Sequence, residues 1–121
     1  MTFEHFNLHP DISAAIAAQG YTSPTPIQAQ SIPHIVNGSD VLGLAQTGTG
    51  KTAAFALPLL HRLMTGPRRR VRALILAPTR ELAVQIHESV TALGKNTKLH
   101  SSVIIGGVGM EPQVQAVRRG S

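Results

Sequence analysis

The sequence of 121 residues contains no cysteine and no tryptophan, and only 3% of its residues are aromatic. Without cysteine there is no disulfide framework, no cysteine-ligated zinc site and no thiol nucleophile, and the absence fits a reducing compartment. No apolar run approaches the roughly 20 residues of a membrane-spanning helix. The N-terminus also lacks the basic segment and apolar core of a signal peptide. We therefore expect a cytoplasmic protein without a membrane segment.

Charged residues are scarce as well, at 14%, but 11 lysines and arginines against 6 acidic residues give a net charge of +5. Hydrophobic residues make up 42%, which is enough for a core, and the length is that of one domain or part of one. The charge favours an anionic partner without distinguishing nucleic acid, nucleotide and solubility. The basic run 68–72 is expected to be solvated, and RNA binding is its alternative.

Glycine and proline divide the chain into alternating helices and short apolar strands. Helices are predicted over residues 11–19, 26–37, 51–64, 80–93 and 111–119. Pro33 is expected to break or kink the second of these helices, and Pro58 to kink the third. Strands are predicted over residues 40–44, 73–77 and 99–105. This order predicts an α/β fold, a parallel sheet flanked on both sides by helices.

The strongest chemical signal is a glycine-rich turn, Ala-Gln-Thr-Gly-Thr-Gly-Lys-Thr, between the first predicted strand and a helix. Such a turn directs backbone N–H groups and a helix N-terminus at a phosphate. Gly48 and Gly50 permit the tight path, Lys51 can reach the β- and γ-phosphates, and the Thr52 hydroxyl can bind Mg²⁺. The first position is alanine where the strict phosphate-loop pattern has glycine, and an accidental turn is the alternative. The predicted phosphate-site residues are Ala45, Gln46, Thr47, Gly48, Thr49, Gly50, Lys51 and Thr52, the last two as catalytic residues.

Several segments together resemble the DEAD-box ATP-dependent RNA helicases. The glycine-rich turn resembles motif I, and residues 20–28 with the upstream Phe3 resemble the Q motif. Residues 78–82, Pro-Thr-Arg-Glu-Leu, resemble motif Ia, and Gly106-Gly107 resembles the glycine doublet that follows it. The resemblance implies a P-loop RecA-like domain with about three strands. Residues 1–29 would then be the Q-motif region, and residues 30–121 the N-terminal part of the ATP-binding domain.

The resemblance also implies roles for single residues. Gln28 would read the adenine of ATP, because its amide matches a donor–acceptor edge that guanine lacks. Tyr21 would stack on the base and Phe3 would support the loop. Taken singly, Tyr21 could be a half-exposed core aromatic and Gln28 a solvent-facing helix residue. The predicted RNA-binding residues, which would hold or admit the phosphate backbone, are Pro78, Thr79, Arg80, Gly106 and Gly107.

Other family motifs are missing from the sequence. It has no Asp-Glu-Ala-Asp motif, which would supply the carboxylates for Mg²⁺ and the attacking water, no Ser-Ala-Thr motif and no second RecA-like domain. We therefore expect a fragment truncated before the Asp-Glu-Ala-Asp motif and inactive by itself. In the family's sheet, absent strands lie between those of motif I and motif Ia, which would leave ladder groups unpaired. The alternatives are a truncated non-catalytic nucleotide- or RNA-binding product, or a P-loop kinase or transport ATPase.

Overall fold

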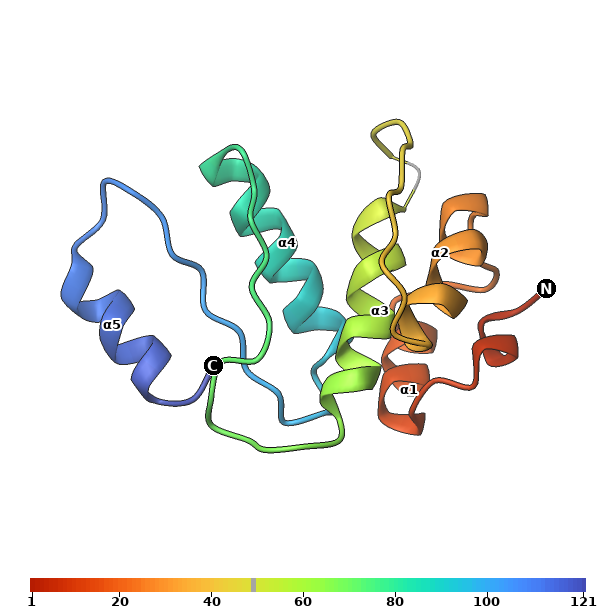
Figure 1. Cartoon of the computed structure of the whole chain (residues 1–121), viewed down its shortest axis with the longest axis horizontal. Helices are drawn as coiled ribbons and strands as arrows, with labels where there is room; N and C mark the ends of the chain where they lie inside the picture. The colour runs from red at the N-terminus through yellow and green to blue at the C-terminus, as the bar shows by residue number, and fades with distance from the viewer. Residues whose placement is uncertain (49) are drawn as a thin grey trace.

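The computed structural model describes residues 1–48 and 50–121, so the predicted phosphate-site residue Thr49 lies outside the described residues. The described part consists of helices joined by irregular segments (Figure 1). The helices are η1 (Phe3–Phe6), α1 (Pro10–Ala18), α2 (Pro26–Val36), α3 (Lys51–Leu63), α4 (Arg80–Leu93) and α5 (Met110–Arg118). The predicted helices are confirmed as α1 to α5. None of the helices among the described residues is long and apolar enough to cross a membrane.

The ends of these helices follow from capping residues. The Thr79 hydroxyl accepts a hydrogen bond from the backbone N–H of Leu82 at 3.1 Å and caps α4. Gly94 ends that helix and donates its own N–H to the Val90 carbonyl oxygen at 2.8 Å. Pro33 lies inside α2 without ending it, so of the expected break or kink the break is wrong. Packing of α2 against α3 outweighs the hydrogen bond that proline removes.

Helix α3 lies at the centre of the hydrophobic core, in contact with α1, α2 and α4 (Figure 1). Its Leu57 is fully buried, as are Ile12 of α1 and Ile32 of α2. The core residues are Phe3, Phe6, Leu8, Ile12, Ile16, Ile32, Ala53, Ala56, Leu57, Leu60 and Leu93. Most of them come from η1 and α1 to α3, so the N-terminal half of the chain is the better-packed half.

The predicted parallel sheet is not confirmed for the part of the chain that the structure describes, because no residue there forms a strand. Within that part, no backbone–backbone hydrogen bond joins the segments 40–44, 73–77 and 99–105 to one another. A strand requires a partner about 4.8 Å away, and these three segments do not supply one another with such a partner. Their apolar side chains stay open, since Leu42, Leu44, Leu74 and Leu76 are each 80–86% exposed.

The three segments nevertheless follow the path that strands would take. In Figure 1 each of them rises towards the upper edge of the molecule and is followed by a descending helix, α3, α4 or α5. The turns from segment to helix therefore lie along one edge. A hollow of about 1470 Å³ is lined by residues 67–77, residues 98–104 and parts of α3 and α4. The described residues thus keep the order of segments of an α/β fold but form neither strands nor a ladder between them.

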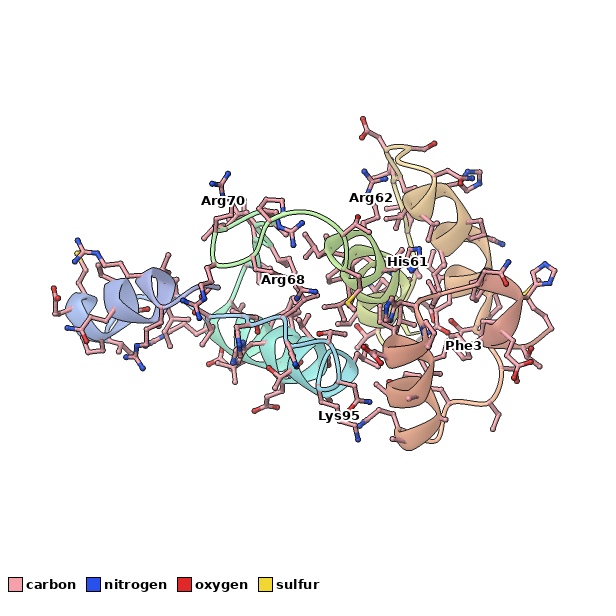
Figure 2. The ribbon with its side chains drawn as sticks, turned by 90° about the horizontal axis from the view of Figure 1, so that it is seen from below. Phe3, His61, Arg62, Arg68, Arg70 and Lys95 are labelled. Carbon is pink, nitrogen blue, oxygen red and sulfur yellow. The ribbon has the colours of Figure 1, made fainter. Side chains whose placement is uncertain are left out.

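Two arginines of the basic run cover the C-terminus of α3. Arg72 donates from Nη1 to the Thr65 carbonyl oxygen and from Nη2 to the Leu63 carbonyl oxygen, both at 2.7 Å. Arg68 donates to the carbonyl oxygens of Met64 at 3.4 Å and Thr97 at 3.2 Å. In Figure 2 Arg68 points into the molecule, whereas Arg70 points away from it. Arg68 stays exposed, as expected of a solvated run, but Arg72 is half-buried, so the expectation is wrong for Arg72. Unpaired carbonyls at a helix end attract such cations.

We expect Arg72→Ala to lower the free energy of unfolding by about 1–2 kcal/mol, since a charged donor is removed from the carbonyls that end α3. Urea unfolding followed by far-ultraviolet circular dichroism measures the change. Arg70→Ala is the matched control in the same run, and its effect should stay within about 0.5 kcal/mol. Equal losses in the two variants would contradict a capping role for Arg72.

Candidate functional site

Gln28 joins the start of α2 to the turn that precedes α3. Its Oε1 accepts a hydrogen bond from the Thr25 backbone N–H at 3.0 Å, and its Nε2 donates to the Gly50 carbonyl oxygen at 3.1 Å. Gln28 is only 4% exposed, so the alternative of a solvent-facing helix residue is wrong. The predicted adenine-reading residue thus contacts the predicted phosphate loop across 22 positions of sequence.

Gly50 occupies a tight place in which any larger residue would have to displace Gln28. It is the N-cap of α3 and has a left-handed φ of 84°. A Cβ atom there would collide with the amide nitrogen of Gln28 and lie 3.1 Å from the Thr25 hydroxyl. Gly48 has a similar φ of 85°, but a Cβ atom there would meet nothing within 4 Å. Both positions need glycine for their backbone, and Gly50 needs it for space as well.

Tyr21 lies on a support made by Phe3. The two rings are stacked, with centroids 6.1 Å apart and an angle of 26° between their planes. Phe3 is 7% exposed and meets Phe6 edge-on at 6.0 Å, so it is fixed in the core. Tyr21 is 43% exposed. A rigid aromatic ring is therefore presented to the surface just before α2, where a planar ligand could stack on it.

The N-terminus of α3 has the character of a phosphate site. No side chain of the described residues caps it, and unpaired N–H groups in a first helical turn attract anions. Lys51 is exposed at this end and Thr52 is half-buried. The turn that leads into it contains Ala45, which is half-buried, and the exposed residues Gln46, Thr47 and Gly48. These features fit the phosphates of a nucleotide.

The same residues fit a magnesium ion less completely. The Thr52 hydroxyl would supply one oxygen ligand. The described residues contain no group of three or more histidines or acidic residues that could hold a metal ion. Protein-bound Mg²⁺ is commonly held by one or two carboxylates together with substrate phosphates. At this site Mg²⁺ would therefore rely on Thr52 and the phosphates themselves.

The residues predicted to bind RNA also come together. Arg80, the first residue of α4, donates from Nη1 to the Gly106 carbonyl oxygen at 3.2 Å. A Cβ atom on Gly107, whose φ is 80°, would lie 3.0 Å from the same Nη1. Pro78, Thr79, Arg80, Gly106 and Gly107 are all exposed. Two segments that sequence reasoning treated separately therefore form one surface at the N-terminus of α4.

Sequence reasoning missed two side chains that hold these regions in place. Gln113 of α5 makes hydrogen bonds to three backbone groups of residues 105–109. His61 of α3 accepts a hydrogen bond at Nδ1 from the His9 backbone N–H at 3.0 Å and so anchors the start of α1. The only sequence signal for Gln113 was its place shortly after the glycine doublet, and no pattern pointed to His61.

Comparisons with known proteins place these features in a family. The profile of the DEAD/DEAH box helicase family matches residues 25–121. The chain is 49% identical over 118 residues to the ATP-dependent rRNA helicase RRP3 of Candida albicans, a match that covers 98% of this chain and 22% of the relative. It is 47% identical over 119 residues to the putative DEAD-box ATP-dependent RNA helicase 29 of Arabidopsis thaliana, covering 98% and 14%.

Comparison of the backbone with solved structures points to the same family. A DEAD box protein from Methanococcus jannaschii matches with a TM-score of 0.90 and 38% identity, over 98% of this chain and 32% of that protein. An RNA helicase from Chaetomium thermophilum bound to ADP matches with a TM-score of 0.89 and 38% identity, over 98% and 30%. The chain thus spans less than a third of each of these relatives. On the profile match, the sequence identity and the shared backbone path, the chain belongs to the DEAD/DEAH box helicase family.

Proposed function

We propose that this chain is the ATP-binding part of a DEAD-box ATP-dependent RNA helicase, which unwinds or remodels short RNA duplexes. The observation that carries the proposal is the hydrogen bond from Gln28 to the Gly50 carbonyl oxygen. It brings the Q-motif region, residues 1–29, against the phosphate loop of residues 30–121, as an adenine nucleotide lying across both would require. The cysteine-free sequence supports a place for the protein in the cytoplasm.

In the proposed ATP site, Tyr21 stacks on the adenine with Phe3 behind it, and Gln28 reads the base edge. The turn 45–50 and the first N–H groups of α3 surround the phosphates. Lys51 neutralises the β- and γ-phosphates, and Thr52 holds Mg²⁺. When bound, Mg²⁺ would offset the negative charge that develops during phosphoryl transfer. The exposure of Lys51 and the uncapped start of α3 support these roles.

On the proposed RNA side, single-stranded RNA or a short duplex lies against the N-terminus of α4. Arg80 binds a backbone phosphate. Its guanidinium carries five N–H donors, of which Nη1 supplies one to the Gly106 carbonyl oxygen, so the others can bond to the phosphate. Gly106 and Gly107 have no side chains, so an RNA backbone can approach closely. Hydrolysis and unwinding by the whole protein would further require the carboxylates of an Asp-Glu-Ala-Asp motif and a second RecA-like domain.

Another class of P-loop protein is not favoured, since the family profile covers residues 25–121. A P-loop kinase or transport ATPase also gives no reason for Arg80 to meet the glycine doublet. The remaining alternative is a non-catalytic product that binds nucleotide or RNA without turning ATP over. An assay of ATP hydrolysis in a protein that carries the missing motifs distinguishes this alternative from the leading proposal.

We expect the chain to bind ATP more tightly than GTP, and Gln28→Ala to remove that preference. Loss of the amide leaves the polar edge of adenine unpaired, which should weaken ATP binding by roughly 1–3 kcal/mol. Equilibrium titration of the 121-residue chain with fluorescent ATP and GTP analogues measures both affinities. Gln30→Ala is the matched control, because Gln30 is an exposed glutamine of the same helix.

Lys51→Ala provides the second control and should abolish binding of both nucleotides. If ATP and GTP bound equally well to the unchanged chain, the adenine-reading role of Gln28 would be wrong. The phosphate site would still stand provided that Lys51→Ala removed both. Binding of ATP that survived Lys51→Ala would overturn the site as a whole.

A further inference from the structure

The loop that contains the glycine doublet receives three hydrogen bonds from one side chain of the next helix, Gln113. Gln113, in the second turn of α5, accepts a hydrogen bond at Oε1 from the Ile105 backbone N–H at 2.7 Å. Its Nε2 donates to the carbonyl oxygens of Gly109 at 3.1 Å and Val108 at 3.4 Å. The amide therefore spans the loop 105–109 from its first residue to its last.

Apart from Gln113 and the Arg80 guanidinium, little defines the shape of this loop. Gly106, Gly107 and Gly109 contribute no side chains, and residues 106–109 are exposed. Gly109 is the N-cap residue of α5, and no side chain of the described residues makes a capping hydrogen bond there. A glycine-rich exposed loop samples many backbone conformations, so an amide that fixes three backbone groups at once restricts it strongly.

The position of the loop decides where the Arg80 guanidinium lies. Arg80 is exposed and long, and its guanidinium donates a hydrogen bond to the Gly106 carbonyl oxygen at 3.2 Å. That carbonyl follows directly after Ile105, whose N–H is held by Gln113. The chain of contacts thus runs from α5 through Gln113, the loop and Gly106 to Arg80 on α4.

We propose that Gln113 is a positioning residue for RNA binding, which holds the glycine doublet so that Gly106 presents the Arg80 guanidinium to a backbone phosphate. The inference rests on the proposed RNA side of the site. Gln113 acts through Arg80 and carries no charge, so it adds no phosphate contact of its own. A preorganised guanidinium loses less side-chain entropy on binding than one that is free to move.

The absence of charge on Gln113 gives the proposal a specific signature. For single-stranded nucleic acid, the slope of log affinity against log salt falls by about 0.7 for each phosphate that the protein no longer neutralises. Arg80→Ala should show a decrease of this size. If Gln113 positions Arg80, then Gln113→Ala should lower the slope as well, although it removes no cation. A glutamine that only stabilises the fold would leave the slope unchanged.

The test is fluorescence-anisotropy titration of the 121-residue chain with a labelled single-stranded oligouridylate from about 50 to 200 mM salt. Gln113→Ala should weaken binding roughly three- to tenfold, because its hydrogen bonds to the loop are removed, and should lower the salt slope. Gln113→Met, which keeps the size and helix propensity, should do the same and guards against a folding defect. Gln115→Ala is the matched control, since Gln115 lies on the same helix and its amide donates to Glu111 of that helix, at 3.4 Å, rather than to the loop.

The double variant Arg80→Ala with Gln113→Ala should bind RNA as Arg80→Ala does, because residues that act through one group are not additive. If Arg80→Ala leaves RNA affinity unchanged, the proposed RNA site itself fails. If Arg80→Ala weakens binding and Gln113→Ala behaves like Gln115→Ala, the RNA site stands and the positioning role is overturned. Weaker binding of Gln113→Ala with an unchanged salt slope, or additive losses in the double variant, overturns it too.

Discussion

Gly50→Ala should destabilise the chain by about 2–5 kcal/mol even without nucleotide. The left-handed backbone at Gly50 costs any residue with a Cβ atom about 1–2 kcal/mol. The new methyl group would also collide with the Gln28 amide and displace it from Gly50 and Thr25. Each of those two hydrogen bonds contributes about 0.5–1.5 kcal/mol. Urea unfolding of the nucleotide-free chain measures the total.

Gly48→Ala separates the backbone cost from the collision. Gly48 has nearly the same φ, 85° against 84°, yet an added Cβ atom meets nothing within 4 Å. Gly48→Ala should therefore lower the free energy of unfolding by the backbone cost alone, about 1–2 kcal/mol. Equal losses at both glycines would mean that the contact between Gln28 and Gly50 contributes nothing to the fold. A combined Gly50→Ala and Gln28→Ala variant should lose less than the sum of its parts.

The helices could be predicted from sequence because their signals are local. Thr79 and Gly94 mark the ends of α4 by capping chemistry that acts within a few residues. A break at Pro33 would have been misleading, since α2 continues through this residue. The helix-breaking penalty of proline is assigned to one residue and takes no account of the packing around it. Here the burial of Ile32 against α3 keeps α2 continuous.

The strands could not be predicted in the same way, because a strand is defined by its partner. Residues 40–44, 73–77 and 99–105 have the apolar pattern of buried strands, and their backbone follows the path of a DEAD-box domain. Pairing depends on neighbours at the right distance, which no local pattern guarantees. The exposure of Leu42 at 86% and Leu76 at 84% is the physical mark of that absent pairing.

Many residues of the candidate site could be predicted from motifs, but the hydrogen bonds that join them could not. The phosphate loop, the Q-motif residues and Arg80 were identified by type and spacing. The bonds from Gln28 to Gly50 and from Arg80 to Gly106 join residues 22 and 26 positions apart, and only the folded chain shows them. Gln113 and Arg72 make hydrogen bonds to backbone groups. Every residue has such groups, so no sequence pattern indicates which of them a side chain will bond.

The 121-residue chain should release no phosphate from ATP, with or without RNA. Phosphoryl transfer to water requires a carboxylate that completes the Mg²⁺ site and a group that orients the water. Among the described residues, no acidic cluster could hold a metal. Residues 73–77 and 99–105 also end in Ala77 and Ile105, where a carboxylate could otherwise face the phosphates. In the proposed site the phosphate loop binds ATP without these groups, so we expect ATP binding to be measurable in the absence of turnover.

Lys51→Ala tests that separation, because it removes the cation that faces the β- and γ-phosphates in the proposed site. In a coupled phosphate-release assay the unchanged chain and Lys51→Ala should give the same background rate, with saturating single-stranded RNA and without it. In the nucleotide titration only the unchanged chain should bind ATP. RNA-stimulated release that is present in the unchanged chain and absent in Lys51→Ala would show that residues 1–121 contain a complete hydrolytic site. The requirement for a carboxylate that completes the Mg²⁺ site would then be wrong, and Thr52 with the phosphates of ATP would suffice to hold the catalytic Mg²⁺.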